Sequence, residues 1–177
     1  NELSIIRLDA ELKGESPAFP EELSVSHPQA IADQMAIFHA REQQQNAEMG
    51  LLQSQYEQRS REVEELTGRK RQTERSLALA VEQRNIAAPL MQRKIYSRVD
   101  YLGLEQKVVS LQGDIESLAS SIPKAQAAAE EAKQRLTLRK AEMEAEINAE
   151  ISKRRTELNS LKETLAAGGD RVTRTEL

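Results

Sequence analysis

Apolar residues recur at alternating steps of three and four positions along two stretches that make up most of this sequence. In residues 28–93 the stripe is interrupted by polar residues, whereas in residues 98–167 it is nearly continuous. A stripe of this period covers one side of an α-helix, and a helix with such a side exposed to water is not stable alone. Each stretch therefore predicts a long helix that needs a partner for its apolar side.

A short interruption separates the two stretches. The segment "QRKIYSRVD", residues 92–100, lacks the stripe and follows Pro89 closely. Two stretches of nearly equal length with a short break between them predict an antiparallel hairpin, in which each stripe covers the other. The alternative is one continuous helix in a parallel dimer, which Pro89 and the polar run after it disfavour. In the hairpin, the numbers of facing residues should sum to about 190, which places Leu66 near Lys124.

Two segments precede the first long helix. Residues 1–13 place aliphatic side chains among charged ones, and Gly14 follows, which predicts a short amphipathic helix with a glycine stop. Residues 14–27 contain two prolines and predict a loop. Pro28 suits the first turn of the next helix, because its missing N–H would have no helical partner there.

The hairpin is thus predicted as a first arm (residues 28–93), a tip (94–97) and a second arm (98–167). Gly168–Gly169 should end the second arm. The following segment "RVTRTEL" weakly favours the start of a strand. The expected fold class is all-α: a long antiparallel two-helix coiled-coil hairpin with a short third helix at its base.

Composition supports this fold and argues against several classes of function. Aromatic residues are 3% of the chain and charged residues 31%, which is typical of long helices and coiled coils. The net charge of −4 and the absence of cysteine argue against a nucleic-acid binder and a disulfide framework.

The basic cluster in residues 68–75 is diluted by nearby glutamates and favours a solvated helix face. His27 and His39 have no evident partners for a metal site. With no catalytic arrangement and no cofactor motif, the chain is not expected to be an enzyme.

One feature of the second arm predicts a mechanical property. Pro123 interrupts it, and the expected register places Gly68 of the first arm opposite. Proline removes a helical hydrogen bond and glycine weakens a helix, so a bend or flexible joint is expected at this level.

The tip combines apolar and cationic residues. A hairpin turn needs only polar turn-forming residues, so apolar side chains at the far end of a slender hairpin predict a docking surface. The alternative is that Ile95 and Tyr96 merely cover the end of the apolar stripe. The candidate docking residues are Leu90, Ile95, Tyr96, Ser97, Arg98 and Leu102.

A short helix, an "FP..L" loop, two long arms and the tip "PLMQRKIYSRVDYLGLE" together resemble the hemolysin-D-like membrane fusion proteins. These are periplasmic adaptors of type I secretion systems. The resemblance implies a hairpin inserted between two halves of a lipoyl-like β-domain, toward which residues 168–177 would lead. It also implies a periplasmic location, with anchoring in the inner membrane through a segment outside this chain. The implied partners are a TolC-type outer-membrane channel at the tip, an ABC transporter, and further copies of the adaptor in a hexameric sheath; nucleic acid is not among them.

The wider family carries an arginine at the tip, then leucine four residues on and serine seven further. Leu90 and Ser97 stand at that spacing here. Ile86 occupies the arginine position, and Arg84 stands two residues earlier, which leaves open whether Arg84 takes the arginine's role. The rival class is a structural coiled-coil rod with no transport role, for which the tip would have no special function.

Overall fold

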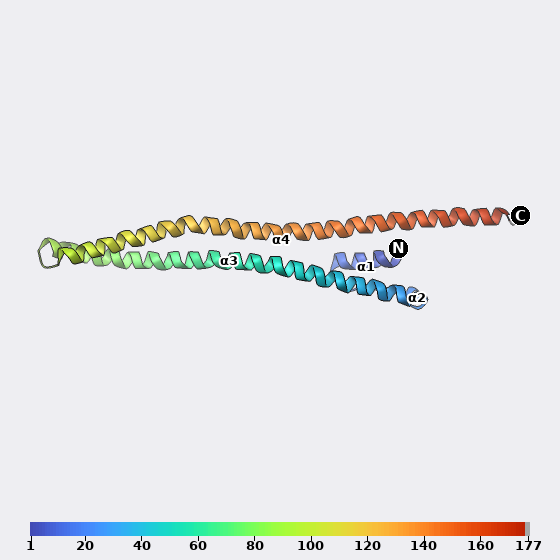
Figure 1. Ribbon diagram of the computed structural model, residues 1–177, viewed down its shortest axis with the longest axis horizontal. Coiled ribbons are helices and arrows are strands. Elements are labelled where there is room, and N and C mark those ends of the chain that lie inside the picture. Colours follow the sequence, from blue (N-terminus) through green and yellow to red (C-terminus); the bar gives the residue numbers. More distant parts are fainter. Residues whose placement is uncertain (176–177) are drawn as a thin grey trace. The chain divides into compact units, whose positions relative to one another are not determined.

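A computed structural model describes residues 1–175 of the chain, with the side chains of residues 1–167, and Figure 1 shows its elements. Within this range the regular secondary structure is entirely helical, and there is no strand. The helices are α1 (Glu2–Lys13), α2 (Glu21–Ser26), α3 (Pro28–Gln92) and α4 (Arg98–Thr175). The predicted all-α hairpin is confirmed, because α3 and α4 are separate helices joined by a short tip. None of the helices in this range combines the length and apolar character that a membrane span requires.

The segment expected to be a loop contains a helix of its own. Residues 14–27 include α2, for which Pro20 is the N-terminal cap and Glu21 and Glu22 form an acidic first turn. Acidic side chains at a helix N-terminus are stabilised by the helix dipole, which favours one short helical turn here. The loop prediction is therefore wrong for this part of the segment.

The second arm is longer than expected. Helix α4 (Arg98–Thr175) passes through Gly168 and Gly169 and continues as far as Thr175, the last described residue. A glycine inside a helix costs only about 1 kcal/mol relative to alanine, so a glycine pair does not by itself end a helix. The expected strand start is likewise not met as far as Thr175; Glu176 and Leu177 lie outside the described residues.

The chain forms two compact units, each crossed by both long helices. The first unit comprises Asn1–Leu51 and the part of α4 that follows Leu136, and the second comprises Leu52–Arg135. The two helices are antiparallel in each unit. In the first unit Glu48 pairs with Arg139 and, earlier in α3, Arg41 pairs with Glu150. In the second unit one cavity is lined by Gln55 of α3 and Ala132 of α4, and another by residues later in α3 and earlier in α4.

In the first unit, α1 packs against both arms. Leu8 of α1 is fully buried and forms an apolar cluster with Ile147 and Ile151 of α4. Asp9 and Glu2 of the same helix pair with Arg155 and Lys162 of α4, at 3.6 Å each. These outer pairs are exposed and contribute little, so the apolar cluster is the main source of stability for this contact.

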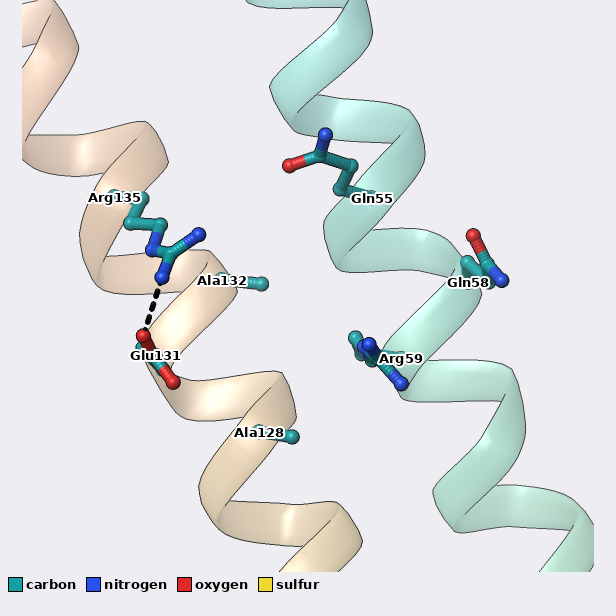
Figure 2. A pocket seen from close by; sticks show the side chains of 7 residues that line it. All are labelled: Gln55, Gln58, Arg59, Ala128, Glu131, Ala132 and Arg135. Atoms are coloured by element: carbon teal, nitrogen blue, oxygen red, sulfur yellow. Dashed lines mark hydrogen bonds and ion pairs between the residues drawn. The ribbon is translucent and has the colours of Figure 1, made fainter.

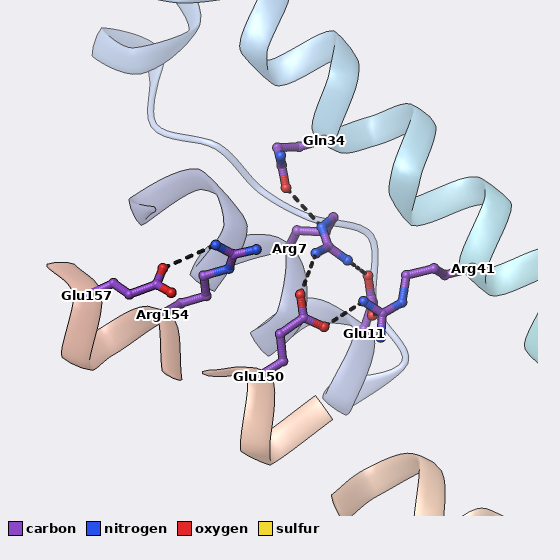
Figure 3. Close-up of polar contacts among 7 residues, drawn as sticks. All are labelled: Arg7, Glu11, Gln34, Arg41, Glu150, Arg154 and Glu157. Atoms are coloured by element: carbon purple, nitrogen blue, oxygen red, sulfur yellow. Dashed lines mark hydrogen bonds and ion pairs between the residues drawn. The ribbon is translucent and has the colours of Figure 1, made fainter. Parts of the chain in front are cut away.

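A buried group of charges lies beside the apolar cluster and joins all three helices (Figure 3). Arg7 and Glu11 of α1 form an ion pair, and their side chains are only 4% and 2% exposed. The Arg7 guanidinium also donates to Gln34 Oε1 of α3 at 2.9 Å and lies 3.8 Å from Glu150 of α4. Arg41 of α3 lies 3.3 Å from Glu11 and donates to Glu150 at 2.8 Å.

This network compensates charges that would otherwise be costly to bury. The hydrogen bond from Arg41 holds the pKa of Glu150 below its usual value, which keeps this carboxylate ionised. Because each arginine contacts groups on other helices, the network ties α1 to one axial position between the arms.

The second unit has a seam, the surface between α3 and α4, that is only partly apolar. Its buried side chains are Ala80, Ala87, Val108, Leu118 and Ala125. Figure 2 shows a polar stretch of the seam, where Ala128 and Ala132 of α4 face Gln55 and Arg59 of α3 across a cavity of about 410 Å³. Small residues opposite long polar ones leave this level loosely packed.

The register in the second unit lies within about one turn of the predicted one. Leu66 lines a cavity together with Leu118 and Ser121 of α4, and Ser121 is three residues, close to one helical turn, from Lys124. A stripe with steps of three and four and several polar interruptions does not fix the alignment more closely than this.

Candidate functional site at the hairpin tip

The end of α3 closes with a capping motif whose key position is Lys94. The N–H of Ile95 donates to the carbonyl of Leu90 at 2.9 Å, and the N–H of Lys94 donates to that of Met91 at 3.0 Å. These two bonds define a Schellman motif, in which the residue at the C′ position adopts a left-handed conformation. Lys94 has that conformation, with φ of 61°. Glycine usually occupies this position because a side chain there is strained.

Helix α4 begins with a side-chain cap. The Ser97 hydroxyl accepts a hydrogen bond from the N–H of Asp100 at 3.5 Å, and the Ser97 carbonyl accepts one from the N–H of Tyr101 at 3.0 Å. Ser97 is therefore the N-terminal cap, and Asp100 adds an acidic charge to the first turn. The structure thus assigns a folding role to Ser97, while its predicted docking role stays a prediction.

Apolar side chains are exposed around this turn. Ile95 is 71% exposed and Leu102 is 52% exposed, whereas Leu90 and Tyr96 are half-buried. Val99, absent from the predicted set, is 77% exposed. The signal that could have identified Val99 is its position one residue after Arg98, outside the apolar stripe of the second arm.

The cations of the tip form no ion pair with the described residues. Arg93, Lys94 and Arg98 are exposed, and no carboxylate in the described part of the chain forms an ion pair with them. Many arginines further from the tip do have partners, such as Arg59 with Glu62 at 3.0 Å. We define the tip surface as the exposed residues at this end: Arg93, Lys94, Ile95, Arg98, Val99 and Leu102.

Arg84 and Ile86 occupy different environments beside the tip. The Arg84 guanidinium donates to Asn85 Oδ1 at 3.0 Å and is half-buried, whereas Ile86 is exposed. Tyr101 of α4 donates its hydroxyl proton to Glu105 at 3.1 Å, which raises the pKa of Tyr101, and the nearby positive charge of Arg84 opposes this rise. The role of Arg84 in docking stays a prediction.

The described residues contain no group of three or more His, Cys, Asp or Glu side chains that could hold a metal ion. His39 contacts Phe38 edge-on and lies 3.6 Å from Glu42, and the ring Nδ1 of His27 lies 2.9 Å from Ser26 Oγ. The tip surface instead offers what a protein partner needs, namely exposed apolar side chains rimmed by unpaired positive charge. The arrangement is suited to binding.

Comparisons with known proteins agree with this fold. A search of curated proteins gives no match to the sequence. Among solved structures, the soluble domain of LipC, a membrane fusion protein of a type I secretion system, is similar, with a TM-score of 0.79 and 20% sequence identity. The similarity covers 92% of this chain and 64% of the LipC chain, so the present chain spans less than two thirds of that relative. The model of the family described as AprE, long alpha-helical hairpin, matches residues 2–171. The chain therefore belongs to the AprE long alpha-helical hairpin family.

Proposed function

We propose that this chain is the hairpin part of a periplasmic adaptor of a type I secretion system. In this proposal the adaptor links an inner-membrane ABC transporter to a TolC-type outer-membrane channel, and the tip surface docks on the channel. The hairpin holds the tip surface at the channel and carries out no chemical reaction. Membership of the hairpin family and the likeness to a membrane fusion protein support the adaptor role.

The observation that carries the docking role is the tip surface itself. Ile95, Val99 and Leu102 expose apolar area that a turn does not need, and Arg98 is a cation without an acidic partner among the described residues. Cations on a docking surface steer association with an acidic partner, and apolar groups add affinity when water is excluded. A channel entrance built from helices, with acidic side chains and apolar grooves, is complementary to such a surface.

Self-association into a hexamer belongs to the same proposal. On α3, Leu79 and Ile86 are exposed and seven residues apart, and on α4, Leu102 and Val109 are exposed and seven residues apart. Residues seven apart lie on the same side of a helix, so each arm has two exposed apolar side chains in a row along one side near the tip. Neighbouring hairpins packed side by side would cover these side chains and repeat the tip contact around a ring, which strengthens weak docking through effective concentration.

The test is export by cells that carry tip variants of the full-length adaptor. Arg98→Glu should reduce the amount of secreted protein in the medium at least tenfold, because it reverses a charge that pairs on docking. Ile95→Asp should do the same, because it adds a charge to a surface that loses water on docking. Adaptor level, helix content and thermal stability should stay near the wild-type values, since both side chains are exposed.

Matched controls separate docking from general damage. Arg61→Glu reverses an exposed cation on α3 away from the tip, and Leu51→Asp adds a charge at a side chain that is as exposed as those of the tip. Both should export normally. Leu118→Asp, at a side chain only 9% exposed, should lose export through unfolding and degradation. Normal export by Arg98→Glu and Ile95→Asp would show that the tip is only a turn and would favour a structural rod.

A further inference from the structure

We propose that the second unit contains a flexible joint where the Ser117–Pro123 segment of α4 faces the Gly68–Thr73 segment of α3. The tip end of this unit would bend there relative to the rest of the unit. The joint is a property of the two arms and does not depend on which partner the tip meets. Three observations support it: weakened hydrogen bonding in α4, weakened helix in α3, and loose packing between them.

In α4 the regular hydrogen-bond ladder is disturbed around Pro123, which lies inside the helix. Proline has no N–H to donate, so the carbonyl of Ala119 loses its helical partner. One turn earlier, the hydroxyls of Ser120 and Ser121 both donate to the carbonyl of Ser117 at 2.9 Å. Serine hydroxyls bonded back to the preceding turn destabilise and often bend a helix. Figure 1 shows α4 changing direction in its yellow-to-orange stretch.

In α3 the facing segment is also weakened. A side chain added at Gly68 would meet no atom within 4 Å, so packing does not require a glycine there. Glycine nevertheless adds backbone freedom to the helix at this point. The Thr73 hydroxyl donates to the carbonyl of Arg69 at 2.9 Å, which repeats on α3 the pattern seen at the α4 serines.

Packing between the two segments is open. A cavity of about 330 Å³ lies at this level of the seam. Its lining residues are Leu66, Arg69, Thr73, Asp114, Ser117, Leu118 and Ser121. Leu66 and Leu118 are the two apolar members of this lining, so little apolar contact joins the arms here. Buried Ala80 and Val108 lie on the tip side, and buried Ala125 lies on the other. At the joint the seam between α3 and α4 is loosely packed, whereas buried side chains fill the seam on either side of it.

The cavity lining refines the sequence-based pairing. Leu66 and Ser121 line the same cavity, so Gly68 lies close to the level of the α4 serines, about one turn from Pro123. The weak points of the two arms still coincide, since the serines and Pro123 belong to one disturbed stretch. Two helices weakened at the same level can bend together without breaking the packing on either side.

Hydrogen exchange on the intact chain tests local opening. Amides of residues 117–122 and 66–70 should exchange at least tenfold faster than those of residues 104–111. The double variant Pro123→Ala with Gly68→Ala should slow exchange in both weak segments at least tenfold, because alanine restores the bond to Ala119 and stiffens α3. Pro123 is exposed, so the alanine there removes no packing.

Gly103→Ala is the matched control, since Gly103 is also a helical glycine with no neighbour within 4 Å of an added Cβ. It should leave exchange in residues 117–122 unchanged. Uniform protection along both arms of the wild-type unit would overturn the proposal. So would equal slowing by Gly103→Ala, because the effect would then be general to the helix.

A distance measurement tests bending directly. The chain has no cysteine, so Gln106→Cys and Glu130→Cys allow two spin labels to be placed on either side of the joint. The labelled positions are roughly 36 Å apart along a regular helix. The wild-type background should give a broad distance distribution, and the double alanine variant a distribution less than half as wide. Equal widths in both backgrounds would refute a joint.

Discussion

Replacing Leu8 by alanine tests how α1 is held between the arms of the first unit. Leu8 is fully buried against Ile147 and Ile151. Truncation of a buried leucine costs about 2–5 kcal/mol through lost transfer energy and the cavity left behind. Because Leu8 is fully buried and α1 contacts both α3 and α4, we expect a cost near the middle of this range, about 3 kcal/mol. Since about 1.4 kcal/mol is a tenfold change, the docked form of α1 should become roughly a hundredfold less favoured.

The assay is hydrogen exchange of residues 2–13 together with far-ultraviolet circular dichroism. Helix α1 has 12 residues, and helices shorter than about 12–15 residues are marginal in water. Once released, α1 should therefore unfold, so that its amides lose protection and the helix content falls slightly. The amides of α3 and α4 in the second unit should keep their protection from exchange, because the apolar stripe there is untouched.

Leu12→Ala is the control, because it makes the same change on the same helix at a side chain that is 38% exposed. We expect a cost of about 1 kcal/mol or less there, with α1 still protected. If Leu8→Ala and Leu12→Ala have equal effects, or if α1 stays protected in Leu8→Ala, the apolar cluster is not what holds α1. The buried ion pair of Arg7 and Glu11 would then have to carry the contact.

Two further predictions concern charge and strain. The hydrogen bond from Arg41 lowers the pKa of Glu150 in the folded chain. The ionised carboxylate therefore contributes its full stability above the usual pKa of 4.5, and this contribution is lost as pH falls through the folded pKa. Glu150→Gln should reduce the drop in Tm between pH 6 and pH 3, and an unchanged drop would contradict this reasoning. Lys94→Gly should raise the free energy of unfolding by about 1 kcal/mol in thermal or urea unfolding, because it removes the strain of a side chain at φ of 61°. The same substitution at the neighbouring Arg93 should give no such gain, and a loss of stability in Lys94→Gly would show that the lysine is not strained.

The tip illustrates how far local sequence reasoning reaches. The break in the stripe after Pro89 predicted where the chain reverses, and α3 indeed ends at Gln92 and α4 begins at Arg98. Ile95 and Leu102 are exposed, as a docking surface requires, but their docking role stays a prediction. The pattern did not reveal the Schellman motif at Lys94, because glycine is the residue that usually marks that conformation. Val99 was missed as well, although its position outside the apolar stripe of the second arm could have identified it.

The sequence alone determined the two long helices, their antiparallel pairing and the all-α class, because apolar periodicity and a short break are local properties of the chain. Tertiary structure alone decided which charges are buried. Arg7 and Glu11 have the pattern of a solvated helix face in the sequence, yet they are buried against Gln34, Arg41 and Glu150. Their burial depends on partners that are distant in sequence, and the stability of a buried charge depends on the partners that surround it. The axial register was decided in the same way, because steps of three and four with polar interruptions permit several alignments until side chains pack against one another.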